Sequence, residues 1–242
     1  MAKGPSNRNA SSRRAGSNSA VRGRVGARGR ARTAVAVGAG STGTRTDRRN
    51  ERRAAILSAA LEEFAARGFA ATRLDDVARG ADVAKGTIYL YFRDKESLFQ
   101  ELVRTMLSPL AGAIAGAPLR DLPIRAVVEM IFDVFVNDIY ATRRRDVIRL
   151  ILAEGPRFPK LAEFYYREVV GRVLPVIRAR LMLAVERGEL AHDALARFPQ
   201  LLVAPALLAV LWSGLFGRFA PLDARELMRA HLDLLFGKEN GP

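Results

Sequence analysis

The twenty residues from Arg73 to Phe92, RLDDVARGADVAKGTIYLYF, predict two short helices joined by a tight turn. In the first helix, Leu74, Val77 and Ala78 recur at the spacing of one helical face. A helix pair of this shape can lay its second helix in the major groove of DNA, because that groove admits an α-helix. The pattern therefore favours an all-α domain that presents its second helix outward.

The ends of the first helix are predicted from its capping residues. Thr72 can cap the helix N-terminus with its hydroxyl, and Asp75 can accept a hydrogen bond from the Thr72 amide. Gly80 can adopt the left-handed backbone that ends a helix, because it has no Cβ. Val83 then supplies an apolar side chain to the turn. We therefore expect the turn at residues 80–83.

The second helix is predicted to bury Ile88 and Phe92, which share one face. On the outer face, Lys85 can place its charge on phosphate or on guanine acceptors, and Gly86 lets the backbone approach the duplex. The alternative is a solvated helix in an unrelated bundle, since helix pairs with small turns are common. The predicted DNA-binding residues are Thr72, Arg73, Lys85, Gly86, Thr87, Tyr89, Leu90, Tyr91 and Lys95.

Lys95 lies at the start of the next predicted helix, DKESLFQELV, directly after Asp94. Free backbone amides at a helix N-terminus and an ammonium group together suit an anion. The phenols of Tyr89 and Tyr91 can also reach phosphate. We therefore expect these three side chains to contact the DNA backbone.

Residues 52–103, RRAAILSAALEEFAARGFAATRLDDVARGADVAKGTIYLYFRDKESLFQELV, closely resemble the N-terminal DNA-binding domain of the TetR family of bacterial transcriptional regulators. One position departs from the pattern: the family often has Ser or Thr where this chain has Ala84. Losing that helix cap costs about 1 kcal/mol. The positions that carry the resemblance are Phe64, Gly68, Thr72, Val83, Gly86, Thr87, Tyr89, Phe92, Lys95 and Leu98.

The resemblance and the composition together imply an all-α chain with three parts. Residues 1–46 are predicted to be a disordered, arginine-rich tail. Residues 47–107 are predicted to form a three-helix DNA-binding domain with the helix-turn-helix at 73–92. Residues 108–242 are predicted to form a helical domain for effector binding and dimerisation, and the segment 149–169 resembles the C-terminal domain of a subgroup of these regulators.

The net charge of +14 is concentrated in the tail, which holds ten basic residues and no acidic one. A mixture of Arg, Gly, Ser and Ala cannot bury enough apolar surface to fold alone, so we expect disorder. A flexible arginine arm can neutralise DNA phosphates or enter a minor groove. The alternative is an inert extension. The basic residues are Lys3, Arg8, Arg13, Arg14, Arg22, Arg24, Arg28, Arg30, Arg32 and Arg45.

Three motif matches are interpreted as accidental. GAGSTG at 38–43 fits the dinucleotide fingerprint, but helical segments follow it rather than a βαβ unit. The pair at 13–14 is not followed by an apolar stretch long enough for export. The charge-free stretch from Phe198 to Gly217 is long enough to cross a bilayer, yet it contains Pro205, and we favour a buried helix without membrane contact.

The composition argues against metal and cysteine chemistry. The chain has no cysteine, which excludes disulfides and thiolate sites and is compatible with a reducing cytoplasm. His192 and His231 are far apart in sequence and form no zinc-binding motif. We therefore expect no metal, no cofactor and no enzymatic activity, since no nucleophile with a base and no phosphate loop is evident.

The rest of the chain is predicted to be helix upon helix, with Pro175 kinking the longest segment. In the family resembled, the last two long helices of each subunit pair with their twins in a homodimer, and the apolar helix around Trp212 fits that role. The predicted segments are 94–115, 123–141, 144–153, 159–187, 195–216 and 223–236. The predicted dimer-interface residues are Leu201, Leu208, Trp212, Leu215, Leu227 and Leu234.

The middle helices of this family usually enclose a pocket for a small-molecule effector. Asp138 lies within an apolar stripe that includes Ile124 and Phe135, so its carboxylate should meet an arginine or face a cavity. The same choice applies to Glu154, and we favour pairing of both with Arg143, Arg144, Arg145 or Arg149. The predicted pocket residues are Met106, Phe132, Phe135, Asp138, Phe164 and Tyr165.

The function expected is that of a cytoplasmic transcriptional regulator. As a dimer, it would read an inverted-repeat operator in double-stranded DNA and act as a repressor that a small molecule releases. The alternative is an architectural protein of low sequence specificity, bound to DNA through the arginine-rich tail. Salt dependence separates the two, because only base recognition preserves a preference for one sequence.

Overall fold

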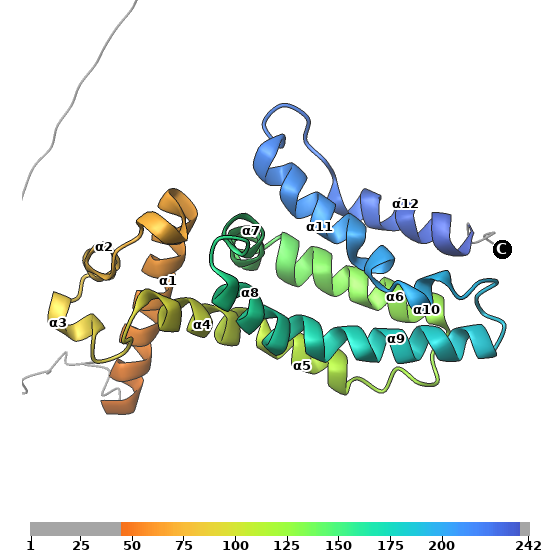
Figure 1. Ribbon diagram of the computed structural model, residues 1–242, viewed down its shortest axis with the longest axis horizontal. Helices are drawn as coiled ribbons and strands as arrows, with labels where there is room; N and C mark the ends of the chain where they lie inside the picture. Colours follow the sequence, from red (N-terminus) through yellow and green to blue (C-terminus); the bar gives the residue numbers. More distant parts are fainter. Residues whose placement is uncertain (1–44, 238–242) are drawn as a thin grey trace, which may run out of the picture. The chain divides into compact units, whose positions relative to one another are not determined.

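The computed structural model describes residues 45–237, and every regular element in that range is a helix (Figure 1). This confirms the predicted all-α fold. The predictions for residues 1–44 lie outside the described range. The last two residues of the predicted tail, Arg45 and Thr46, are the first residues of α1. The helices near the N-terminal end are α1 (Arg45–Ala71), α2 (Leu74–Gly80), α3 (Lys85–Ile88) and α4 (Lys95–Met106).

The apolar periodicity of α1 builds the core of the first domain. Ile56, Ala60 and Phe64 recur on one face and are fully or almost fully buried. Helices α2 and α4 pack on this face, and α3 packs on α2. Phe69 and Phe99 meet edge to face at 6.1 Å between ring centroids, which closes the core between α1 and α4.

The remaining elements form the C-terminal helices of Figure 1. They are α5 (Ser108–Gly116), α6 (Ile124–Val134), the π-helix η1 (Phe135–Tyr140), α7 (Arg144–Glu154), α8 (Pro159–Tyr165), the π-helix η2 (Tyr166–Val170), α9 (Gly171–Glu186), α10 (Ala194–Arg197), α11 (Gln200–Leu215) and α12 (Ala224–Phe236). Helix α12 packs on α6 and α11, and α11 packs on α7.

Two predicted helices are broken, and proline accounts for both breaks. The segment 94–115 divides at Leu107, because Pro109 occupies the first turn of a new helix, α5. The segment 195–216 divides between α10 and α11 at Phe198 and Pro199. Pro175 lies inside α9, and the backbone departs from α geometry one turn earlier, at η2.

A continuous hydrophobic core joins the two sets of helices, from Ile56 in α1 to Leu232 in α12. Within it Arg180 is almost fully buried, and its guanidinium donates to the carbonyl oxygens of Leu119 (2.7 Å) and Leu122. Between residues 45 and 237, no helix combines the length and the apolarity needed to cross a bilayer. The charge-free stretch 198–217 instead contains α11, which has 16 residues.

Candidate nucleic-acid interface and effector region

The helix-turn-helix has the predicted inner face, with Val77 and Ala78 of α2 and Ile88 of α3 all buried. The prediction that Gly80 takes a left-handed backbone is wrong, because Asp82 does so, with φ of 52°. Aspartate tolerates this region through its short polar side chain. Gly80 serves a different purpose: a Cβ there would lie 3.3 Å from the Ala59 Cβ, so its lack of a side chain lets α2 approach α1.

Thr72 does not cap α2, which contradicts the sequence prediction. Its hydroxyl donates to the carbonyl oxygens of Gly68 (2.8 Å) and Glu63 (3.2 Å), and the residue is 2% exposed. The N-cap residue of α2 is Arg73, whose side chain makes no capping bond. The carbonyl groups near the end of α1 lie within reach of the hydroxyl and accept its hydrogen bond instead. Thr72 therefore stabilises the end of α1, and its side chain is not available to DNA in this conformation.

The outer face of α3 is exposed, as the helical period predicts. Leu90 is 79% exposed and Tyr89 50% exposed, while Thr87 and Tyr91 are half-buried. A Cβ added to Gly86 would have no neighbour within 4 Å, so the backbone is open to a close partner on this side. Arg73 and Lys85 are also exposed beside this face.

The α-helical part of α3 is short, ending at Ile88, and the chain continues as a tight turn to Phe92. In this turn the Phe92 amide donates to the Ile88 carbonyl at 2.9 Å. Both side chains are buried, so they anchor the outer face of α3 from beneath. Lys85 lies 2.7 Å from Asp75 of α2, and the hydrogen bond and charge of that carboxylate raise the pKa of Lys85.

The start of α4 is held by its own capping box. The Asp94 carboxylate accepts from the Ser97 amide at 2.7 Å, and the Ser97 hydroxyl lies 3.2 Å from the Asp94 amide, which donates to it. The Ser97 amide is the main reason that the pKa of Asp94 is lowered. This cap fixes the direction in which α4 leaves the turn after α3.

Lys95 is held by the protein through two of its three ammonium N–H donors. Its ammonium donates to the carbonyl oxygens of Phe69 and Ala70, both at 2.8 Å, and lies 4.8 Å from the centre of the Phe69 ring. These carbonyls are at the end of α1, where no helical amide remains to bind them. Lys95 thus ties α4 to α1, which the sequence pattern does not reveal.

Glu154, at the end of α7, also contacts the end of α1. Its Oε1 accepts from the Phe69 amide at 3.0 Å, and its Oε2 lies 3.8 Å from Arg157. Burial of Glu154 was predicted and is confirmed, at 9% exposed. The predicted partners among residues 143, 144, 145 and 149 are wrong, because the carboxylate turns toward the first domain.

Gly68 makes room for this contact. It has φ of 76° and ψ of 166°, and a Cβ there would lie 2.5 Å from Glu154 Oε1. A side chain is therefore excluded both by the left-handed backbone and by the carboxylate. We call the contacts of Gly68, Phe69, Lys95 and Glu154 the Phe69 junction.

The opposite end of α7 contacts α4. Arg144 Nε donates to the Met106 carbonyl at 2.8 Å, and the guanidinium of the neighbouring Arg143 bonds Glu62 of α1 at 3.2 Å. Helix α7 therefore touches the first domain at both of its ends. A displacement of α7 would act on α1 and on α4 together.

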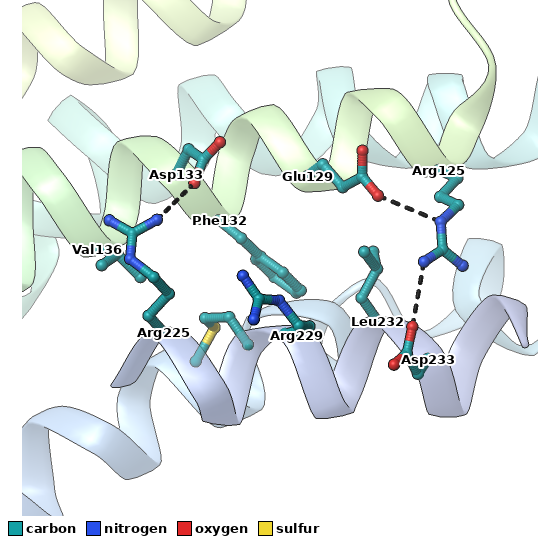
Figure 2. Close-up of a pocket in the computed structure, with 10 residues that line it drawn as sticks. Arg125, Glu129, Phe132, Asp133, Val136, Arg225, Arg229, Leu232 and Asp233 are labelled. Atoms are coloured by element: carbon teal, nitrogen blue, oxygen red, sulfur yellow. Dashed lines mark hydrogen bonds and ion pairs between the residues drawn. The ribbon is translucent and has the colours of Figure 1, made fainter. Parts of the chain in front are cut away.

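A groove of about 570 Å³ separates α6 from α12. Figure 2 shows Phe132 and Leu232 between the two helices, with Arg229 beside them. Arg225 pairs with Asp133 at one end, at 3.3 Å, and the opposite end is closed by ionic contacts of Arg125. The apolar floor consists of Phe132, Val136, Met228 and Leu232.

The predicted pocket residues differ in their surroundings. Phe132 lines the groove, whereas Phe164 is buried beneath Arg104 and Arg167, whose guanidinium carbons lie 4.8 and 5.2 Å from its ring centre. Phe135 is also buried, and Met106 is half-buried. Burial raises the pKa of Tyr165 to about 12, so this phenol stays protonated at neutral pH.

Asp138 is exposed, which contradicts its prediction as a pocket residue or a buried ion pair. The prediction assumed a regular α-helix from Ile124 onward. The structure has the π-helix η1 from Phe135 to Tyr140, and its wider turn shifts the phase of every later residue. The backbone carbonyl of Asp138, rather than its carboxylate, accepts a hydrogen bond from the Thr142 hydroxyl at 2.7 Å.

Over residues 45–237, no group of acidic and histidine side chains could hold a metal ion. His231 lies 3.2 Å from the Leu201 carbonyl, and burial lowers the pKa of its imidazole. The histidine therefore belongs to the packing of α12 against α11.

Two family models match the chain and together cover both sets of helices. Residues 56–102 match the model for bacterial regulatory proteins of the tetR family. Residues 130–232 match the C-terminal domain of AefR-like transcriptional repressors. The chain belongs to the TetR family. Both resemblances inferred from the sequence are thereby confirmed.

Curated relatives and solved structures agree with this assignment. Over 73 residues the chain is 45% identical to the HTH-type transcriptional regulator YhgD of Bacillus subtilis. That match covers 30% of this chain and 38% of YhgD. It is 27% identical over 158 residues to AcrR of Shigella flexneri, covering 64% and 68% of the two chains. The structure of Salmonella enterica GusR superposes with a TM-score of 0.57 at 26% identity, covering 76% of this chain and 95% of GusR.

This TetR-family chain carries a stripe of apolar side chains on α11 that nothing in the described chain covers. Leu201, Leu208 and Leu215 are each about half exposed or more, as is Leu234 of α12. Trp212 is half-buried: its ring packs against Phe216 at 5.0 Å, and its Nε1 donates to the Ala220 carbonyl at 2.7 Å. The predicted interface residues other than the half-buried Trp212 and Leu227 are therefore accessible to a partner.

Sequence reasoning missed several groups at this TetR-family site. The arginines of the α6–α12 groove (Arg125, Arg225 and Arg229) were not singled out, because their positions come together only through the packing of α12 on α6. The junction role of Lys95 was also missed. A detectable signal did exist for Phe69, since a glycine followed by an apolar residue is typical of a helix C-terminus with a hydrophobic contact.

Proposed function

We propose that this chain is a homodimeric repressor in the cytoplasm that reads an inverted-repeat operator with α3 and is released by a small-molecule effector. The observation that carries the proposal is the contrast within α3, whose inner side is fixed by Ile88 and Phe92 while its outer side is open. Such a helix can enter the major groove without disturbing the core. Family membership favours this function over an architectural protein, and no enzymatic activity is proposed.

The proposed dimer follows from the stripe on α11 and α12. An exposed row of leucines on two adjacent helices would be costly in water and is relieved by a twofold partner. Two copies of α3 would then face half-sites about 34 Å apart or more, so the operator should be an inverted repeat.

The groove between α6 and α12 is the proposed effector site. Its apolar floor and its arginines fit a small ligand with an apolar body and an anionic group. Of the three groove arginines, Arg229 forms no ion pair with residues 45–237 and is therefore the one available to such a ligand. A hundredfold release of DNA requires about 2.7 kcal/mol of coupling, which α7 can transmit through Glu154 and Arg144.

The test begins with purified protein and fragmented genomic DNA, from which bound fragments are selected and sequenced. We expect an inverted repeat among the selected fragments. Tyr89→Ala should then weaken binding to that repeat about tenfold or more, with thermal unfolding unchanged, because Tyr89 is half exposed and outside the core. Equal affinity of the wild type for selected and random duplexes would overturn the proposal.

A further inference from the structure

Four arginines lie on one face of the first helical turns of α1. Arg45, Arg48, Arg49 and Arg52 follow the spacing i, i+3, i+4, i+7, which places them within about 100° of arc. All four are exposed. Of the acidic residues of these turns, Asp47 projects from the opposite side of the helix, and Glu51 lies beside the face, three residues after Arg48. We call the four residues the α1 arginine face.

The charges of this face are not neutralised by carboxylates of the described chain. Other arginines of the same domain are paired: Arg53 lies 2.6 Å from Glu101, and Arg67 lies 3.3 Å from Glu63. Over residues 45–237, no such ion pair is formed by any member of the α1 arginine face. Like charges three and four residues apart repel and destabilise a helix, so an anionic partner would relieve the repulsion.

The arginine face adjoins the proposed DNA-reading helix. Its four side chains line a hollow of about 570 Å³ together with Tyr91, the half-buried phenol in the turn directly after α3. The arginine face therefore adjoins the turn that follows α3. A duplex whose major groove receives α3 continues past Tyr91 toward α1.

We propose that the α1 arginine face binds phosphates of the duplex that flanks the half-site read by α3. The inference rests on the proposed function and adds a second, sequence-independent contact to it. Arginine suits this role because its guanidinium binds phosphate through two parallel hydrogen bonds. Exposed arginines on the outside of a helix contact the DNA backbone without reading bases, so they set the affinity and the salt dependence.

The experiment compares the full chain with the triple variant Arg48→Gln, Arg49→Gln, Arg52→Gln by fluorescence anisotropy across a series of salt concentrations. Each arginine–phosphate bond that is removed lowers the steepness of log K against log[salt] by about 0.9. We expect the slope to become shallower by about 2 to 3, while the ratio of affinities for selected and random duplexes stays the same. Trimming the flanking base pairs should weaken the wild type and leave the triple variant almost unaffected.

A matched control removes the same charge elsewhere: Arg167→Gln, Arg172→Gln, Arg178→Gln on η2 and α9, where all three residues are exposed. An unchanged slope in the α1 variant, or an equal change in the control, would overturn the inference. Because every duplex has phosphates, the slope can also be measured on random DNA. Absence of sequence preference in the wild type, which would refute the proposed function, is therefore a separate outcome.

Discussion

At the Phe69 junction, one residue is held from three sides: its amide by Glu154, its carbonyl by Lys95, and its ring by Phe64, Phe99 and Phe158. On the outer face of α3, Tyr89 and Leu90 are largely open to solvent. Both regions belong to the same DNA-binding domain. The difference indicates that contacts distant from α3 fix the position of this helix, while its outer surface stays free for a partner. Substitutions at the junction should therefore change stability, and substitutions on α3 should change binding.

The largest effect is expected for Gly68→Ala. The new Cβ meets Glu154 Oε1 and the backbone must keep φ of 76°, so we expect a decrease of about 2–4 kcal/mol in the free energy of unfolding. Urea denaturation followed by circular dichroism measures it. Gly188→Ala is the control, because Gly188 has φ of 74° but open space around its Cβ position. Equal decreases in the two variants would show that the carboxylate contributes nothing.

Glu154→Ala should have the next largest effect. It leaves the buried Phe69 amide without an acceptor, which costs about 1–3 kcal/mol. Glu154→Gln should recover part of that stability, since its amide oxygen can still accept. Hydrogen exchange of the Phe69 amide gives a local readout, and fast exchange confined to this junction is expected in the alanine variant. Protection equal to that of the wild type would contradict the assigned bond.

Substitution of two lysines, one in each region, compares the two regions directly. Lys95→Ala removes two bonds to carbonyl oxygens at the end of α1 and should cost about 1 kcal/mol of unfolding free energy. Lys85→Ala removes an exposed pair with Asp75 and should leave the free energy of unfolding essentially unchanged. DNA affinity should fall in the Lys85 variant without any decrease in melting temperature. The reverse pattern would place the phosphate contact at residue 95, as the sequence first suggests.

The capping box of α4 should respond to acid. The folded state lowers the pKa of Asp94 below its ordinary value of 3.8, so the ionised cap stabilises α4 at neutral pH. That contribution disappears as the pH falls below 3.8 and through the folded pKa. Asp94→Ala should therefore cost about 1 kcal/mol at neutral pH, and urea midpoints of the two proteins should converge on acidification. A difference that stays constant down to the acid transition would argue against ionisation of the cap.

The fold and the helix-turn-helix could be predicted because both depend on local periodicity. The buried faces at Ile88 and Phe92 follow from the 3.6-residue repeat, and glycine or proline marks several helix ends. The breaks at Pro109 and Pro199 were not predicted. The exposed outer face of α3 was predicted on the same basis. The left-handed residue was predicted at Gly80, from the conformational preference of glycine, but it is Asp82. Gly80 is needed instead for close packing against Ala59.

What could not be predicted depends on partners that are distant in sequence. The Glu154 carboxylate meets an amide 85 residues away, and Lys95 meets carbonyls 25 and 26 residues away. Asp138 was misplaced for a different reason, because one π-helical segment changes the phase of the helix. Local patterns in one sequence predict neither the packing of α7 on α1 nor the position of the π-helical segment.

Trp212 gives the chain a built-in optical reporter. It is the only tryptophan in the sequence, and its indole lies half-buried on α11 among the uncovered leucines. Excitation of this one ring reports the polarity of that surface without any added dye. Burial of the indole by a second copy should shift its emission to shorter wavelength as protein concentration rises, so pairing can be titrated with the unmodified chain.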